Sequence, residues 1–162
     1  MANSYAVGYL TKQALADRST TQEEILGAWV RDQKGNVFRY AKGVASGAKG
    51  KLVHISKDWA TTLVTTTTNV ALSGQKCAIM CAAAVATEFG WVCTEFTEDT
   101  DAEWGIIPDG SMAVNGAVQT TATGGYVDDA ATETIAGIWN STTGGTQGTV
   151  KTTFSWCDPW SL

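Results

Sequence analysis

Apolar and polar positions alternate in short runs along this chain, and the clearest pair of runs flanks residues 86–90. Residues 76–85 are apolar for nearly their whole length, which is typical of a strand buried on both faces. Residues 92–96 alternate from one position to the next, as a half-buried strand does. Together the two runs predict a β-hairpin, with Trp91 anchoring its second strand and Gly90, which tolerates positive φ, in the turn.

A helix is the alternative for the first of these runs, because its central Ala82-Ala83-Ala84 has high helix propensity. Against the helix, the run is short, has no N-cap residue before it and is followed closely by Gly90. The strand is therefore the preferred interpretation.

Other runs predict further strands separated by glycine-bearing turns. Residues 25–40 fit a hairpin in which Leu26, Ala28 and Val30 share one side and Gly35 takes the left-handed turn position. Residues 65–68, four threonines, fit either a strand or an exposed linker. In all, about eight to ten strands at roughly ten-residue spacing predict a single all-β domain, an antiparallel β-sandwich or β-barrel. The other expected strands are residues 52–55, 112–122, 135–139 and 150–156, with a turn at Gly124-Gly125.

Residues 1–24 are polar and weakly patterned, and we expect them to form an extended N-terminal arm ahead of a β-domain at residues 25–162. Its few aromatic residues recur at short intervals, which favours an arm that becomes ordered on a neighbouring subunit over a floppy tail. Thr20 or Thr21 is a candidate N-cap for a short helix at the end of this arm, with an acidic residue, Glu23 or Glu24, reaching back.

The composition narrows the classes of function. Charged residues make up only 17% of the chain, which fits a surface largely covered by partners but equally a bland β-domain. The net charge of −5 argues against nucleic-acid binding, which needs a basic patch. Residues 1–10 lack the basic and apolar regions of a secretory signal, and no apolar run approaches the ~18 residues of a membrane-spanning helix.

The residue types that carry chemistry do not form a recognisable site. Four cysteines, Cys77, Cys81, Cys93 and Cys157, are expected to be reduced and structural, because three lie in apolar runs. Cys77 and Cys81 would be about 13 Å apart on a strand, too far to form a disulfide. The single histidine, His54, is isolated in sequence and fits a half-buried strand residue better than a metal ligand.

Three weaker patterns do not meet the requirements of a functional site. Gly50-Lys51 is followed by Leu52 rather than by the Ser or Thr of a phosphate-binding loop. The acidic residues 98–103 lack the ligand spacing of a calcium-binding EF-hand and fit a solvated loop. Asp128 and Asp129 are adjacent, so they point to different faces and make a poor acid–base pair. We therefore expect no catalytic residue, no cofactor and no bound metal.

Several stretches, read in order, resemble the decoration (cement, or head-stabilising) proteins of tailed-phage capsids. They are Leu26-Gly27 with residues 34–43 (KGNVFRYAKG), residues 88–92 (EFGWV), residues 121–129 (TATGGYVDD) with residues 135–138 (IAGI), and the final strand at residues 150–156. The resemblance covers most of the chain from about residue 25 to residue 156. The chain departs from the family pattern in an acidic insertion around Trp104 and in having Gly124-Gly125 where Ala-Gly is usual.

The resemblance implies a β-rich structural protein with no catalytic site, on the outer surface of an icosahedral phage head. Such a protein is made in the host cytoplasm without a signal peptide. It binds the major capsid protein, often as a homotrimer at three-fold or local three-fold positions, and stabilises the head by bridging subunits. The candidate partner contacts are apolar side chains near the two ends of the chain: Tyr5, Tyr9, Leu10 and Trp160.

Two other classes of function remain as alternatives. A receptor- or carbohydrate-binding β-module of a head fibre or spike is suggested by the seven tryptophans, because exposed indole rings stack on sugars as well as on proteins. A small enzyme is the weakest alternative, since the chain has one isolated histidine and no nucleophile elbow or metal-ligand spacing.

Overall fold

The fold is that of a nearly all-β protein, as the sequence predicts. The computed structural model describes residues 11–71, 76–95, 105–110, 117–129, 133–140 and 154–156. These residues form two sheets and one short helix, α1 (Thr66–Ala71). The first sheet contains β1 (Arg18–Ser19), β2 (Trp29–Arg31), β3 (Val37–Lys42), β4 (Leu52–Ile55), β5 (Thr61–Leu63), β6 (Lys76–Met80) and β7 (Phe89–Glu95). The second contains β8 (Ala117–Thr120), β9 (Val127–Asp128), β10 (Glu133–Asn140) and β11 (Phe154–Trp156).

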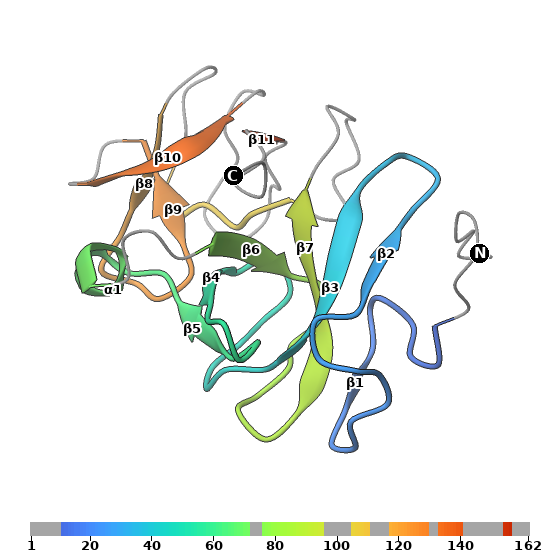
Figure 1. Ribbon diagram of the computed structural model, residues 1–162. Helices are drawn as coiled ribbons and strands as arrows, with labels where there is room; N and C mark the ends of the chain where they lie inside the picture. Colours follow the sequence, from blue (N-terminus) through green and yellow to red (C-terminus); the bar gives the residue numbers. More distant parts are fainter. Residues whose placement is uncertain are drawn as a thin grey trace.

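The first sheet curls until it partly closes on itself. Its strand order is β2-β3-β7-β6-β4-β5, with antiparallel neighbours, and β1 pairs with the beginning of β7 (Figure 1). Lys42 at the end of β3 forms a parallel bridge with Ala60, just before β5. The Lys42 N–H donates to the Trp59 carbonyl (2.8 Å), and the Thr61 hydroxyl donates to the Lys42 carbonyl (2.7 Å). These contacts make five of the strands a partly closed barrel.

One hydrophobic core joins the two sheets, and a second lies on the opposite face of the first sheet. The joint core combines side chains from the first sheet, such as Phe38 and Trp91, with side chains from the second, such as Val118 and Val127. The other core is built from smaller residues: Ala41, Val53, Ile55, Ala78, Met80, Ala84 and Val92. Because β6 contributes to both cores, it is buried on both faces, as its continuous apolar run predicts.

Both predicted hairpins are confirmed, but one turn is not where the sequence suggested. In the β2–β3 hairpin, Gly35 adopts φ 92°, and the Asp32 carboxylate accepts the N–H groups of Lys34 (2.9 Å) and Asn36 (2.8 Å). In the β6–β7 hairpin, Gly90 lies inside β7, paired with Ala41, and is not a turn residue. The connection is longer, residues 81–88, because it packs on residues 43–47 and is held there by backbone hydrogen bonds.

The part of the expected arm that is described lies on its own chain. Gln13 and Leu15 are buried, and the Trp91 indole N–H donates to the Gln13 carbonyl (3.1 Å). The helix expected near residues 20–24 is not formed; β1 ends at Ser19, where it pairs with β7, and residues 20–24 form bends and irregular structure. Residues 1–10 lie outside the described residues, so their ordering on a neighbour stays a prediction.

The run of threonines at residues 65–68 begins α1 rather than forming a strand or a linker. The Thr68 N–H donates to Thr65 Oγ1 (3.1 Å), while the Thr65 N–H donates to Thr68 Oγ1 (2.7 Å). This reciprocal pair satisfies backbone donors at the start of a helix, as a capping box does. Among the described residues, no helix combines the length and the apolar character that crossing a bilayer demands.

Removing this cap tests its contribution. Thr65→Ala should lower the free energy of unfolding by about 0.5–2 kcal/mol, because the Thr68 N–H loses its acceptor. Thr67→Ala is the matched control, since Thr67 is exposed, and should change stability by less than about 0.5 kcal/mol. Urea unfolding followed by circular dichroism measures both, and equal effects would argue against the cap.

Candidate binding surface

Two large apolar side chains stand in solvent at one end of the first sheet. Ile25 is 77% exposed and Trp29, in β2, is 57% exposed. Figure 1 shows β2 beside β3 at the outer end of the sheet. Single exposed apolar residues are common, but several large ones grouped together often mark a surface that binds a partner. A third exposed apolar residue in the described part of the chain, Val85 (39% exposed), lies in the connection between β6 and β7.

A tight turn before β2 sets the position of both side chains. The Ala28 N–H donates to the Ile25 carbonyl (2.9 Å), and Gly27 adopts φ 82°, which a type II turn requires at this position. The Gly27 N–H donates to the Tyr40 carbonyl, and the Tyr40 N–H donates to the Ala28 carbonyl. Gly27 and Ala28, just before β2, therefore both lie opposite the single residue Tyr40 of β3. This is a glycine β-bulge, and it leaves Ile25 at the corner of the turn.

The indole ring of Trp59 packs against the same turn. A Cβ on Gly27 would lie only 2.6 Å from Trp59 Nε1, so the ring covers the glycine closely. The guanidinium carbon of Arg39 is 5.4 Å from the centroid of the Trp59 ring, a cation–π contact. Trp59 itself has φ 59°, a backbone conformation that a bulky residue seldom adopts.

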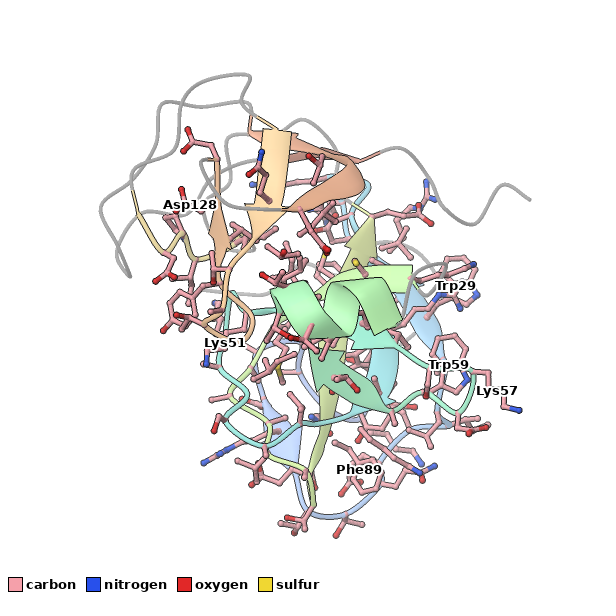
Figure 2. The ribbon with its side chains drawn as sticks, turned by 90° about the vertical axis from the view of Figure 1, so that its left-hand side faces the viewer. Trp29, Lys51, Lys57, Trp59, Phe89 and Asp128 are labelled. Atoms are coloured by element: carbon pink, nitrogen blue, oxygen red, sulfur yellow. The ribbon has the colours of Figure 1, made fainter. Side chains whose placement is uncertain are left out.

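Arg39 connects the two tryptophans. It is the direct cross-strand partner of Trp29, so the two side chains share one face of the sheet. We name Trp29, Arg39 and Trp59 the Trp–Arg surface. Figure 2 shows Trp29 and Trp59 on the same side of the molecule, with the exposed Lys57 beside Trp59. Tryptophan and arginine are the residue types that most often dominate binding energy at protein interfaces, and an exposed indole also stacks on sugars.

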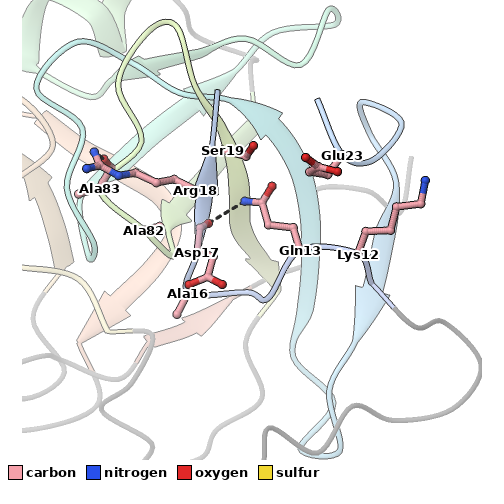
Figure 3. A pocket seen from close by; sticks show the side chains of 9 residues that line it. All are labelled: Lys12, Gln13, Ala16, Asp17, Arg18, Ser19, Glu23, Ala82 and Ala83. Atoms are coloured by element: carbon pink, nitrogen blue, oxygen red, sulfur yellow. Dashed lines mark hydrogen bonds between the residues drawn. The ribbon is translucent and has the colours of Figure 1, made fainter. Parts of the chain in front are cut away.

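A pocket of about 550 Å³ lies elsewhere, between the segment around β1 and the β6–β7 connection (Figure 3). Its buried polar side chain, Gln13, already has partners: Nε2 donates to the carbonyls of Asp17 (2.8 Å) and Phe89 (3.3 Å), and Oε1 accepts from the Tyr40 hydroxyl (2.8 Å). Arg18 donates to the Ala83 carbonyl (2.8 Å). These polar groups hold the N-terminal segment on the sheet, and we assign the pocket no ligand.

Burial disfavours the charged forms of the histidine and of two of the cysteines. His54, in β4, is 2% exposed, deeper than the half-buried position expected, and its Nδ1 is 3.6 Å from Cys77 Sγ. Burial raises the pKa of Cys77 to about 12 and also raises the pKa of Cys93, so both remain thiols at neutral pH. Cys77, Cys81 and Cys93 form no disulfide and are buried, as predicted, while Cys157 lies outside the described residues.

Burial of His54 predicts a loss of stability in mild acid. Desolvation lowers the pKa of its imidazole from the usual 6.5, so the unfolded chain takes up the proton first as the pH falls. The free energy of unfolding should therefore be greatest above pH ~6.5 and decline below it, by at most about 1.4 kcal/mol per pH unit. Urea unfolding at about pH 7.5 and about pH 5.5 measures this difference in the free energy of unfolding.

The matched control for this pH effect is His54→Leu. His54 is the only histidine in the chain, so the variant should show a nearly flat stability between these two pH values. If wild type and variant lost the same stability on acidification, the protonation of His54 would not be the cause.

The residues predicted from sequence as partner contacts, Tyr5, Tyr9, Leu10 and Trp160, all lie outside the described residues. The sequence did not single out Trp29, because a tryptophan in a strand-like run is by default a core residue. The alternation of the strand does indicate that Trp29 faces away from the core, because Leu26, Ala28 and Val30 share one side of the predicted strand and Trp29 lies on the other. Trp91 shows the opposite outcome and is buried, as predicted.

No family model, no curated protein and no solved structure matches this chain. Within the part of the chain that the structure describes, no three His, Cys, Asp or Glu side chains gather in a way that would hold a metal ion. The case for function therefore depends on the Trp–Arg surface and on the sequence motifs.

Proposed function

We propose that this protein is a non-catalytic component of a tailed-phage virion, which decorates the outside of the head and stabilises it by bridging major capsid protein subunits. The order of the motifs from Leu26-Gly27 to residues 150–156 supports this proposal. The structural observation that carries it is the exposure of Trp29, next to Arg39, and of Ile25, in the turn before β2, at the outer end of an otherwise well-packed sheet. In this proposal the protein is made in the host cytoplasm and forms homotrimers at three-fold positions of the shell.

The energetics of such a surface suit a shell protein. Burying an exposed large apolar side chain contributes about 1.5–3 kcal/mol, so a surface such as that around Trp29 gives a modest affinity per copy. A shell presents many identical sites, and a subunit that contacts several of them gains affinity through effective concentration. A low charge content suits such contacts, because few charged groups must be desolvated.

The test is co-sedimentation of the purified protein with undecorated phage heads. Wild-type protein should sediment with the heads, and Trp29→Ala should weaken this binding by about 10-fold or more. The matched control is Val85→Ala, which truncates another exposed apolar residue far from Trp29 in sequence and should bind as wild type does. Absence of any complex between wild-type protein and heads would contradict the proposal.

A second candidate function, binding of a receptor or carbohydrate by a fibre or spike module, is favoured by the same exposed indole. A pyranose ring stacks on an indole face, and a neighbouring guanidinium such as that of Arg39 can bond to its hydroxyl groups. A glycan array would distinguish the two functions. Clear hits that Trp29→Ala abolishes, together with no binding to heads, would favour the carbohydrate module.

A further inference from the structure

Among the described residues, β2 is the last strand at its end of the seven-stranded sheet, and its backbone has a defined outward pattern. In the β2–β3 pair, the Tyr40 N–H donates to the Ala28 carbonyl (2.9 Å) and the Asp32 N–H to the Asn36 carbonyl (3.0 Å). Ala28 and Asp32 therefore direct backbone groups inward, to β3. In an antiparallel pair, the backbone groups of successive residues point alternately toward and away from the partner strand. The N–H and C=O groups of Val30 therefore also point toward β3, while those of Trp29 and Arg31 point away from it.

The side chains of Trp29 and Arg31 complement each other across this edge. They are two positions apart, so they lie on the same face, and both are largely exposed. The Arg31 guanidinium is 3.8 Å from the Glu95 carboxylate, and this exposed ion pair is weak enough for the Arg31 side chain to turn outward, toward a second copy. If two copies of β2 pair antiparallel about Val30, Trp29 of each copy lies opposite Arg31 of the other, and each indole meets a guanidinium.

We infer that β2 is a self-pairing edge, through which two copies of this chain form a two-fold symmetric dimer. Each Trp29–Arg31 pair across the axis exchanges two backbone hydrogen bonds through the outward groups, about four in the dimer. The strand contains no proline and no inward-pointing charge that would block pairing, and its length of three residues limits the interface to a few backbone bonds. A second copy fits better than an unrelated extended segment, because both halves of the complementarity come from this chain.

The dimer brings the two copies of the Trp–Arg surface side by side and covers only the part of each Trp29 indole that meets Arg31 of the other copy. Edge pairing about a two-fold axis perpendicular to the sheet keeps equivalent faces on the same side, so the two copies of Trp29 lie on one continuous face. The interface is small, and we expect a dissociation constant of about 10 µM or weaker. The pairing is a two-fold contact of the free chain, separate from the three-fold assembly proposed on the shell, and it does not depend on the proposed function.

Sedimentation velocity of the full-length protein, over a concentration series that spans this constant, tests the inference. Arg31→Pro removes an N–H group that points away from β3, so it breaks no hydrogen bond within the sheet. The dimer loses two backbone hydrogen bonds, one for each copy, and we expect dimerisation to weaken by about 30-fold. Arg31→Ala, the matched control, keeps the N–H and should weaken it less. Circular dichroism melting of each variant establishes that the fold is retained.

A charge pair at position 29 gives a test that does not need proline. Trp29→Lys places like charges opposite Arg31 of the other copy and should abolish the dimer, while Trp29→Glu, of similar size, should retain it. Adding Arg31→Glu to Trp29→Lys should restore association, because opposite charges again meet across the axis. A monomer at every concentration overturns the inference, as does an oligomer, trimer included, that is indifferent to Arg31→Pro and to the sign of the charge at position 29.

Discussion

Replacing Trp91 with alanine is expected to lower the free energy of unfolding by about 3–5 kcal/mol, a large part of the stability of a domain of this size. Trp91 is 1% exposed at the centre of the core that joins the two sheets. Its ring meets the Tyr40 ring edge-on, with centroids 5.2 Å apart, and its indole N–H bonds to the Gln13 carbonyl (3.1 Å). The substitution therefore leaves a cavity and an unpaired buried carbonyl together.

Trp91→Phe separates these two effects. Phenylalanine keeps an aromatic ring beside Tyr40 but has no N–H to donate, so we expect a loss of about 1–3 kcal/mol. Urea unfolding followed by far-ultraviolet circular dichroism measures both variants without relying on tryptophan fluorescence. An alanine variant as stable as wild type would mean that the two sheets do not share this core.

Replacing Gly43 with alanine should also destabilise the protein strongly, by about 2–4 kcal/mol, although Gly43 has no positive φ. A Cβ at this position would overlap the Val85 carbonyl oxygen and lie 2.6 Å from the Ala84 carbonyl oxygen. The Gly43 N–H also donates to the Glu88 carbonyl (2.8 Å), so the strand cannot move away without losing that bond. The β6–β7 connection would have to shift, because backbone atoms do not yield as side chains do.

Gly90→Ala is the matched control for Gly43→Ala. Gly90 has strand geometry, and a Cβ there would meet Ala84 Cβ at 3.5 Å and the Asp17 carbonyl oxygen at 3.6 Å, which are ordinary contacts. We expect a change of less than about 1 kcal/mol, since alanine loses less conformational entropy than glycine on folding. Comparable losses for the two variants would show that the tight packing at Gly43 is not the cause.

Features that depend on neighbouring residues were predictable from the sequence. The β2–β3 and β6–β7 hairpins, the buried β6 and the left-handed Gly35 and Gly125 follow from local alternation and from the freedom of glycine. The burial of Trp91 and the free thiols followed from the apolar runs around them. Local patterns gave the wrong prediction at two places. Gly90 pairs with Ala41 within the sheet instead of forming a turn, and residues 65–68 begin a helix because Thr65 and Thr68 cap each other.

The sequence by itself determined that this is a strand-built domain, and approximately where its strands lie, because a period of two is a property of adjacent residues. Only the tertiary structure decided that Lys42 meets Ala60 to close the sheet, and that Trp59 packs on Gly27. It alone left Trp29 in solvent while burying Trp91, two residues of one type in similar runs. The physical reason is that burial depends on which distant segment covers a face, and no local pattern encodes that partner.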